Sequence, residues 1–218
     1  TKDTGLISNT TPDWMIDKGA YQLLLRRPAV NPEDDHFDAT SVASKWINWN
    51  SPTLSLTTIP GWLTISTGSA NPCGVIQPVP SGDWYIETEM IWGDEPALRW
   101  GATGLMLTNS TNPASCISVN FSSGGRDSAG LFRMNVTKFV NNDYDSNYFE
   151  VLSATSAKEH QFLRIQKTGT TYKFYFSETG KSWFFFYSAS ATTLGITPTY
   201  FGIFCWQPFS HFNYFLRY

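Results

Sequence analysis

The feature that most constrains this chain is a series of short apolar or alternating segments, separated by clusters of Gly, Pro, Asn, Asp and Ser. Such clusters include NSTNPAS, SSGGRDS and NNDYDSN. Many short strands at near-regular spacing, with turn residues between them, predict a β-sandwich or barrel. No stretch keeps a helical period for three turns, so the chain is predicted to be all-β. The predicted strands are Leu54–Thr57, Trp62–Ser66, Val75–Val79, Trp84–Trp92, Gly104–Thr108, Cys116–Phe121, Leu131–Phe139, Tyr148–Leu152, Gln161–Lys167, Tyr172–Ser177, Trp183–Ser188, Tyr200–Trp206 and Phe212–Arg217.

Alternation within the segments predicts which side of each strand is buried. In Trp84–Met90, the residues Trp84, Ile86 and Met90 share one face, and both glutamates share the other. We interpret the two glutamates as a solvated strand face. Two half-buried layers packed face to face explain this pattern, and glycines such as Gly169 supply the hairpin turns.

Composition excludes several classes of protein. Aromatic residues make up 16% of the 218 residues and charged residues only 15%, which excludes a disordered chain and a coiled coil. The net charge is −3, so the chain has no basic surface for nucleic acid. No apolar run approaches the roughly 20 residues of a membrane-spanning helix, and we expect no membrane insertion. The chain starts at Thr1 rather than Met, so we expect a processed terminus or a piece of a longer protein.

The three cysteines, Cys73, Cys116 and Cys205, lie far apart in the sequence. An odd number without a C-x-x-C spacing argues against a disulfide framework and against a zinc site. Two of the three lie in apolar segments, where a free cysteine behaves as a small hydrophobic residue. We therefore predict buried free thiols.

Residues 1–35 differ in character from the rest of the chain. Prolines bound the segment, and Tyr21–Arg27 has the pattern of either a short strand or a helical turn. We predict an extended N-terminal arm that either folds back on the sandwich or packs against another subunit or a preceding domain. The run Trp183–Tyr187 is apolar at every position, so strand alternation leaves one aromatic set outside the core. We predict that the arm or a neighbouring subunit covers that set, and that the protein is a homo-oligomer.

Several segments resemble the concanavalin A-like lectin/glucanase superfamily. They are Asp34–Ser41 with Lys45-Trp46, Gly61–Ile65, Asp83–Thr88, Gly104–Leu107, Phe162–Gly169 continuing through Tyr172 and Gly180–Trp183, and Phe212–Arg217. In particular the chain resembles the lectin-like modules of bacteriophage tail fibres and other virion proteins. The resemblance spans residues 34–218 and implies a two-sheet jelly-roll sandwich over residues 36–218. It also implies a curved sheet that can cradle a glycan, assembly as a homo-oligomer, and a role in adhesion or decoration.

Catalysis is not predicted. Glu87-Thr88-Glu89 resembles part of the Glu-x-Asp-x-Glu strand pattern of the superfamily's glucanases, but Ile91 and Trp92 stand where the second catalytic glutamate is required. Without a proton donor for the leaving group, the two-carboxylate mechanism fails. The sequence also shows no nucleophile motif and no phosphate-binding loop.

An acidic cluster near residue 35 is a candidate calcium site. Asp34, Asp35 and Asp38 concentrate the hard oxygen ligands that Ca²⁺ prefers. The alternative is an ordinary acidic surface turn. No other cofactor is predicted.

Aromatic residues that lie outside the inward-facing set are the candidates for glycan binding. The apolar C–H faces of sugar rings stack on Trp and Tyr, while nearby polar groups bind the hydroxyls. The alternative is a subunit interface, where the same residues are enriched. The candidate ligand-binding residues are Tyr85, Glu87, Trp92, Arg99, Trp100, Asn120, Tyr175 and Trp206.

Together these observations favour a non-catalytic structural protein of a bacteriophage virion. It would be a fibre, spike or decoration module located in the virion, with other virion proteins as partners. Its lectin-like domain would attach to a host surface glycan or reinforce the particle. The alternatives are a secreted carbohydrate-binding accessory module of a bacterial glycoside hydrolase and an active hydrolase.

Overall fold

The computed structural model describes the backbone of residues 13–17, 20–24, 35, 37, 39–58, 61–66, 71–92, 101–110, 115–123, 132–153, 161–206 and 211–217. It describes their side chains except at 13–17, 20–24, 91–92, 123, 132, 152–153 and 211–217.

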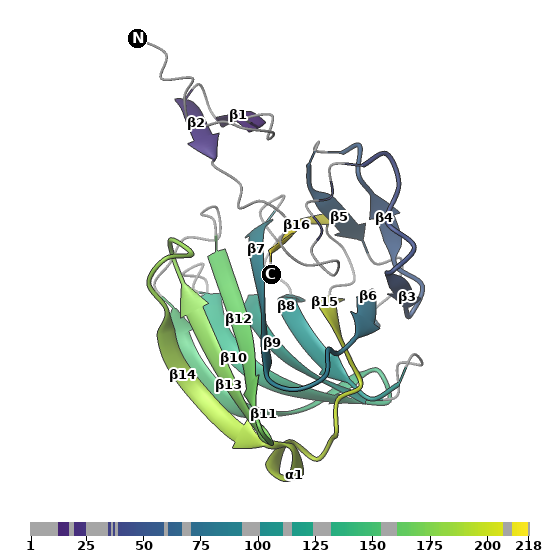
Figure 1. The fold of residues 1–218 in the computed structure, drawn as a ribbon, viewed down its shortest axis with the longest axis vertical. Coiled ribbons are helices and arrows are strands. Elements are labelled where there is room, and N and C mark those ends of the chain that lie inside the picture. Colours follow the sequence, from purple (N-terminus) through teal and green to yellow (C-terminus); the bar gives the residue numbers. More distant parts are fainter. Residues whose placement is uncertain are drawn as a thin grey trace.

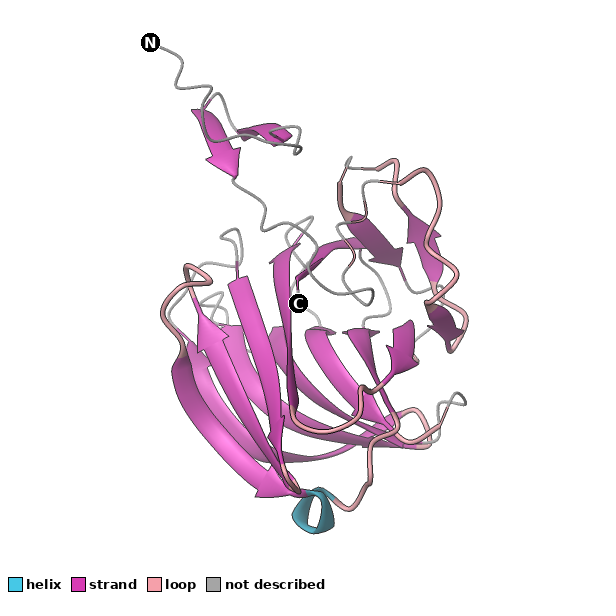
Figure 2. Ribbon diagram, viewed as in Figure 1, coloured by secondary structure: helices cyan, strands magenta, loops and turns pink. Residues whose placement is uncertain are grey.

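Two seven-stranded antiparallel sheets form the body of the protein (Figures 1 and 2). Sheet 1 has the strand order β14-β13-β12-β7-β16-β5-β4, and sheet 2 has the order β11-β10-β9-β8-β15-β6-β3. This confirms the predicted all-β sandwich. The strands of sheet 1 are β4 (Thr53–Ser55), β5 (Leu63–Ser66), β7 (Trp84–Trp92), β12 (Gln161–Thr168), β13 (Thr171–Ser177), β14 (Phe184–Ser190) and β16 (His211–Arg217). Those of sheet 2 are β3 (Ile47–Trp49), β6 (Cys73–Pro78), β8 (Gly101–Thr108), β9 (Ser115–Ser123), β10 (Phe132–Val140), β11 (Asp143–Ser153) and β15 (Tyr200–Trp206).

A separate two-stranded hairpin, β1 (Asp13–Asp17) and β2 (Ala20–Leu24), lies outside both large sheets. Of the two forms expected for the segment that starts at Tyr21, the structure shows a strand as far as Leu24. The proposed division at residue 35, and the role of residues 1–35 as an arm, stay predictions.

Most predicted strands are present, and β7 and β15 have the predicted bounds. The clearest difference is β11, which begins at Asp143 rather than Tyr148. Asn141 and Asn142 both have positive φ values, of 52° and 69°, as a tight hairpin turn requires. The turn therefore takes only these two residues of NNDYDSN, and the remaining polar residues pair along β10. The short strand β3 and the one-turn helix α1 (Ala191–Leu194) were not predicted.

The main core lies between the two sheets. Sheet 1 contributes Trp84, Ile86, Met90, Leu163, Ile165 and Phe174, and sheet 2 contributes Leu105, Leu107, Val119, Phe201 and Ile203. These residues alternate with outward-facing ones, which confirms the alternation read from the sequence.

A second apolar cluster lies on the outer face of sheet 2. All of its members come from that sheet, and all are buried: Trp49, Ile76, Ala102, Met106, Cys116, Phe139 and Phe204. The ring centroids of Phe139 and Phe204 are 5.0 Å apart, although strands β9 and β8 separate their strands. Strands lie about 4.8 Å apart in a sheet, so the two rings converge because this face is concave.

All three cysteines are buried free thiols, as predicted. Burial raises the pKa of the Cys116 thiol, because a thiolate would lose its hydration in the apolar cluster. The described residues also contain no helix long and apolar enough to cross a membrane.

Strand β14 is an edge strand, and it departs from simple alternation. The register against β13 shifts between Phe174 and Tyr175, so Phe186 and Tyr187 both pack on the main core. Phe184 and Phe185 are exposed. The part of the chain that the structure describes does not supply the predicted cover for these two rings.

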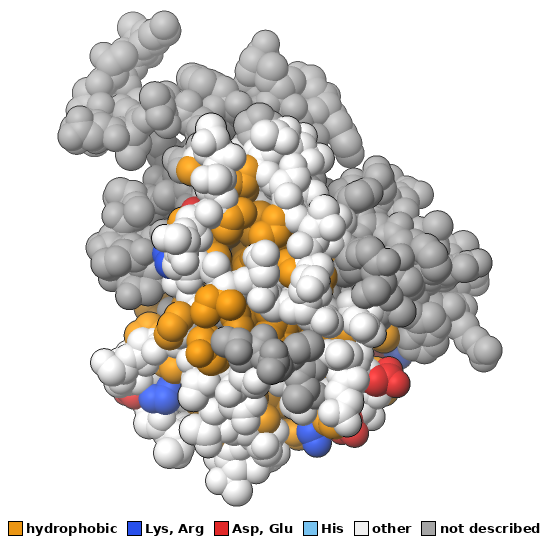
Figure 3. Space-filling model, turned by 90° about the vertical axis from the view of Figure 1, so that its right-hand side faces the viewer, with side chains coloured by type: hydrophobic (Ala, Val, Ile, Leu, Met, Phe, Trp, Pro, Cys, Tyr) orange, Lys and Arg blue, Asp and Glu red, His pale blue; other side chains and the backbone are white. Residues whose placement is uncertain are grey.

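Charged side chains are sparse on the side of the molecule shown in Figure 3, and apolar ones gather near its centre. The edge strands β3 and β4 lie on this side (Figure 1). The low content of charged residues in the sequence is therefore apparent on this side of the surface.

Candidate functional site

The outer face of sheet 1 carries the candidate site. Strand alternation places Tyr85, Glu87 and Glu89 of β7 on this face, because their neighbours Ile86 and Met90 belong to the main core. Arg164 on β12 is the register partner of both Glu87 on β7 and Tyr175 on β13. The antiparallel pairing therefore brings an acid, a guanidinium and a phenol into one row across three strands.

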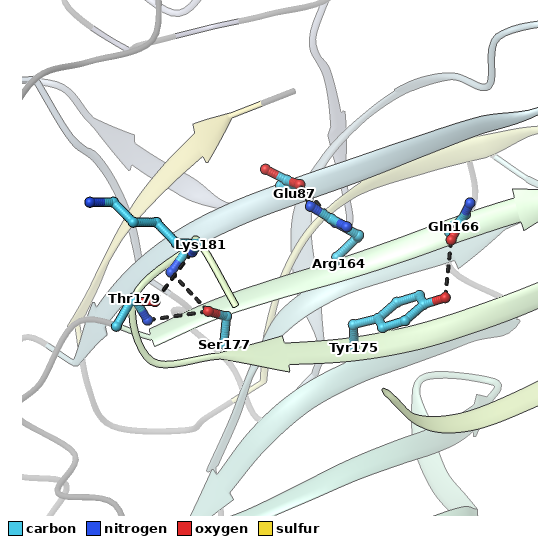
Figure 4. Close-up of polar contacts among 8 residues, drawn as sticks. Glu87, Arg164, Gln166, Tyr175, Ser177, Thr179 and Lys181 are labelled. Atoms are coloured by element: carbon cyan, nitrogen blue, oxygen red, sulfur yellow. Dashed lines mark hydrogen bonds and ion pairs between the residues drawn. The ribbon is translucent and has the colours of Figure 1, made fainter. Parts of the chain in front are cut away.

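An ion pair lies at the centre of this row (Figure 4). Arg164 Nε donates to Glu87 Oε1 at 2.7 Å, and a second guanidinium nitrogen, Nη2, donates to the same oxygen. The Glu87 side chain is only 7% exposed, and a buried carboxylate requires a nearby counter-charge. Since Oε1 accepts two hydrogen bonds, the guanidinium holds Glu87 in place on the strand face.

Both glutamates are buried, which corrects our prediction of a solvated strand face. The physical reason is the central position of their strand in the sheet. β7 lies in the middle of sheet 1, between β12 and β16, and Glu89 has register partners on both sides, Phe162 and Phe215.

Two aromatic rings enclose Arg164. Its guanidinium carbon lies 4.0 Å from the centroid of Trp183 and 5.0 Å from that of Tyr85. Both distances are typical of cation–π contacts. The guanidinium thus links the two rings and fixes their separation.

The loop after β13 places Trp183 in this position. Ser177 Oγ accepts hydrogen bonds from the backbone N–H groups of Thr179, at 3.2 Å, and Gly180, at 2.8 Å (Figure 4). Gly180 has a φ of +67°, and a Cβ atom there would lie 2.9 Å from the ring of Phe162. A glycine is needed at this point because the loop bends back onto the outer face of β12.

Exposed aromatic surface lies beside this rigid centre. Tyr85 is 48% exposed and Phe185 is 56% exposed. The Tyr175 hydroxyl donates to Gln166 Oε1 at 3.1 Å, and the rings of Tyr175 and Phe185 meet edge to face at 5.8 Å. Rings with a polar edge next to an amide can stack on an apolar ligand face and bind its hydroxyls.

The structure brings together only part of the predicted site. Tyr85, Glu87 and Tyr175 share the outer face of sheet 1, whereas Asn120 and Trp206 belong to strands of sheet 2. Arg99 and Trp100 lie outside the described residues, as does the side chain of Trp92. The prediction missed Arg164, Gln166 and Trp183. The outward phase of Arg164 and Gln166 is visible in the alternation around Leu163 and Ile165, but their proximity to Tyr85 depends on strand pairing. Trp183 lies in the loop before β14, so no strand phase predicts its position.

The candidate calcium ligands are described only in part. Asp35 accepts hydrogen bonds from the backbone N–H of Phe37, at 2.9 Å, and from Trp46 Nε1, at 2.8 Å. Asp34 and Asp38 lie outside the described residues. Within the described part of the chain, no group of three His, Cys, Asp or Glu residues is arranged to hold a metal ion. The calcium site stays a prediction.

Comparison with known proteins gives similarity at the level of structure. No protein-family model and no curated protein matches the sequence. The structure is similar to the GH43 BlXynB protein from Bacillus licheniformis, with a TM-score of 0.67 and 18% identity over 86% of this chain and 39% of that chain. It is also similar to the carbohydrate-binding module CBM66 from Bacillus subtilis, with a TM-score of 0.54 and 15% identity over 79% of this chain and 92% of that module. A third similar structure is the CBM2 module of the evolved Dit of Lactobacillus casei BL23 phage J-1, with a TM-score of 0.52 and 12% identity over 84% of this chain and 94% of that module.

These identities are low, so the similarity concerns the fold. The chain spans about two fifths of the GH43 chain but nearly the full length of the two carbohydrate-binding modules. The protein therefore has a β-sandwich fold that is similar to that of these carbohydrate-binding modules.

Proposed function

We propose that this protein is a non-catalytic carbohydrate-binding module that uses the outer face of sheet 1. The observation that carries the proposal is the exposed ring of Tyr85 beside the Arg164–Trp183 stack, with Gln166 and Tyr175 next to it. Tyr85 offers a ring face to the C–H side of a sugar. Because Gln166 Oε1 accepts the Tyr175 hydroxyl, its Nε2 is directed to donate to a sugar oxygen.

The Glu87–Arg164 pair supports a binding role rather than a catalytic one. In the proposal, the carboxylate serves to hold the guanidinium between Tyr85 and Trp183, so that the rings are positioned before a ligand arrives. A rigid platform loses less conformational entropy on binding. The two charges of the pair cancel, which favours a neutral glycan.

We place this module in a bacteriophage virion, as part of a fibre, spike or decoration protein that attaches to a host surface glycan. The similar fold of the phage J-1 Dit module supports this assignment. We also propose that other virion proteins and further copies of the chain are its partners, with the exposed Phe184 and Phe185 of edge strand β14 as a contact.

The alternative is an accessory module of a bacterial glycoside hydrolase. The higher TM-score of the GH43 structure, 0.67, favours it. Fluorescently labelled protein distinguishes the two proposals: saturable binding to intact bacterial cells supports host attachment, whereas binding only to isolated plant polysaccharides supports the accessory module.

The experiment that tests the binding site compares two tyrosines of equal exposure. Tyr85 is 48% exposed on sheet 1, and Tyr144 is 47% exposed on β11 of sheet 2. A glycan array identifies the ligand, and calorimetry then measures its affinity for Tyr85→Ala and Tyr144→Ala. We expect Tyr85→Ala to weaken binding about tenfold or more, because a stacking ring contributes on the order of 1–3 kcal/mol. Tyr144→Ala serves as the control and should bind as the wild type does.

Equal affinity of Tyr85→Ala and Tyr144→Ala for the glycan would contradict a binding site at Tyr85. The non-catalytic assignment has its own test, which is incubation of the protein with the glycans it binds. Release of reducing ends that stops in Glu87→Gln would overturn that assignment.

A further inference from the structure

The edge strands of the two large sheets differ in how well they are protected. The described structure ends sheet 1 at β14 and β4, and sheet 2 at β11 and β3. Natural sheet edges are kept from pairing with other chains by being short or by carrying charges. β3 and β4 have three residues each, and β11 carries the exposed Asp143, Asp145 and Glu150. β14, with the sequence FFFYSAS, is neither short nor charged.

Most of the β14 edge is regular. The register against β13 shifts only between Phe174 and Tyr175, and residues 187–190 pair without interruption with residues 171–174. A regular edge presents a row of backbone N–H and C=O groups that a further strand can bind. β14 can therefore accept a strand from outside its own sheet.

The inward-facing rows of both sheets reach solvent beside this edge. Phe184 is the register partner of Phe176, which packs on the main core, and the two rings stack at 6.5 Å. Phe184 is nevertheless 62% exposed. On β11, Val151 is the register partner of the core residue Met134 and is 39% exposed. Exposed apolar side chains in inward-facing rows indicate a surface that a partner covers.

β14 and β11 face each other across the sandwich. The Phe149 ring meets Phe186 at 5.5 Å, and the Tyr148 ring meets Tyr187 at 6.4 Å. The two strands therefore run in opposite directions, and Phe184 lies on the same side of these contacts as the exposed valine of β11. The apolar surface at this edge thus comes from both sheets, and a partner has to supply an apolar face of its own.

The β1–β2 hairpin has such a face. In the described structure it pairs with neither large sheet, and it lies apart from them in Figure 1. Its register sets Trp14 opposite Leu23 and Ile16 opposite Tyr21, so these four residues share one face. A two-stranded hairpin is at best marginally stable alone. The hairpin therefore requires a surface that covers its apolar face.

The hairpin and the β14 edge fit each other in charge as well. If the apolar face of the hairpin continues the inward row at Phe184, its other face, with Asp13 and Asp17, continues the outward row of sheet 1. That row includes Lys173, the register partner of Ser188 on β14. Opposite charges then lie on the same side of the extended sheet, which favours the pairing.

A second copy of the chain is the occupant that these observations favour. In the described part of one molecule, the edges of the hairpin and of β14 are both open. Two copies that exchange hairpins use both hairpins and both β14 edges around one two-fold axis, which gives a closed dimer.

We propose that the β1–β2 hairpin of one copy binds along edge strand β14 of a second copy and extends its sheet 1, with the face that contains Trp14 and Ile16 over Phe184. The proposal rests on the part of the proposed function in which β14 is a contact between copies, and it names the segment that makes this contact. It does not depend on carbohydrate binding.

Light scattering coupled to size exclusion tests the proposal on the 218-residue chain over a range of concentrations. We expect a dimer. Phe184→Lys places a charge on the edge, and Ile16→Lys places one on the apolar face of the hairpin. Each should raise the dimer dissociation constant at least about tenfold, because each removes apolar contact from both halves of the dimer. Tyr144→Lys is the matched control on edge strand β11, where Tyr144 is 47% exposed, and should leave the constant unchanged.

A mixture of the two variants tests whether the hairpin crosses between copies. Phe184→Lys keeps an intact hairpin and Ile16→Lys keeps an intact β14, so one unaltered contact forms only between different variants. With a fluorescent donor on one variant and an acceptor on the other, we expect energy transfer at a concentration where neither variant alone is a dimer. Circular dichroism shows whether each variant is folded, and Phe184→Ser replaces Phe184→Lys if the lysine variant does not fold.

Three results would overturn the proposal. A wild-type chain that is monomeric at every concentration would remove both the exchange and the proposed contact between copies. A dimer that is weakened by Phe184→Lys but not by Ile16→Lys would keep β14 as the contact and exclude the hairpin. Variants that stay monomeric when mixed would show that the hairpin does not cross between copies. In each case the glycan affinity at Tyr85 is measured separately and is unaffected.

Discussion

The outer faces of the two sheets differ although both follow the same strand alternation. On sheet 1, Tyr85 and Phe185 are exposed around a charged pair. On sheet 2, Phe139, Phe204 and Asn120 are buried on a concave face, and the groups around Asn120 are neutral. Alternation determines which side chains leave the inter-sheet core. The curvature of the sheet then influences how much of those side chains meets water.

The largest expected effect comes from the charged pair on sheet 1. Arg164→Met removes the guanidinium that offsets the buried Glu87 carboxylate, and we expect the free energy of unfolding to fall by about 3 kcal/mol. The double variant Glu87→Gln/Arg164→Met removes both charges and should recover most of this loss. Urea unfolding followed by circular dichroism gives both values. An Arg164→Met protein as stable as the wild type would show that the pair is not structurally coupled.

The next effect concerns the loop that positions Trp183. In Gly180→Ala, the alanine must adopt a positive φ, and its Cβ atom lies 2.9 Å from the ring of Phe162. We therefore expect the free energy of unfolding to fall by about 2 kcal/mol. Gly169→Ala is the matched control, since Gly169 also has a positive φ, +57°, but a Cβ there would meet nothing within 4 Å. It should lose only about 1 kcal/mol. Equal losses in the two variants would mean that the contact with Phe162 is unimportant.

One buried glutamine in the inter-sheet core allows the cost of an unpaired polar side chain to be measured. Gln161 is buried, and in the described part of the structure neither polar atom of its amide has a partner. Gln161→Met keeps a similar volume and removes the desolvation cost, so the free energy of unfolding should rise by about 1 kcal/mol. If Gln161→Met destabilises the protein instead, the side-chain amide has a hydrogen-bond partner that the described part of the structure does not contain.

The smallest expected effect reports on the burial of the sheet 2 face. Burial raises the pKa of the Cys116 thiol above its ordinary value, so the folded protein keeps the proton that the unfolded chain loses above about pH 8.5. A group with a raised folded-state pKa makes its full contribution to stability below the unfolded pKa, and this contribution is lost progressively as the pH rises toward the folded-state pKa. Stability should therefore fall by about 1 kcal/mol near pH 9 relative to neutral pH, and less in Cys116→Ala. Fast reaction of the Cys116 thiol with a disulfide reagent in the native protein would show that this face opens readily.

Sequence reasoning predicted the strands well because their signals are local. Alternation identified Trp84, Ile86 and Met90 as inward-facing, and Gly169 marked a hairpin turn correctly. It failed in the asparagine-rich hairpin, where two left-handed residues were enough to turn the chain.

The site was harder to predict because it depends on pairing between distant strands. Glu87 and Arg164 are 77 positions apart, and only the register of β7 with β12 brings them together. The burial of Glu87 and the division of the predicted residues between two faces follow from the sheet order. Neither property can be read from strand phase alone.

The compensation of Arg164 by Glu87 has a consequence for the conditions under which the protein works. Attraction between unpaired surface charges weakens as dissolved ions screen it, over about 8 Å at physiological ionic strength. A guanidinium whose charge is already balanced by a buried carboxylate offers little for salt to screen. A neutral glycan bound as proposed at this surface should therefore have about the same affinity in brackish water as in dilute culture medium.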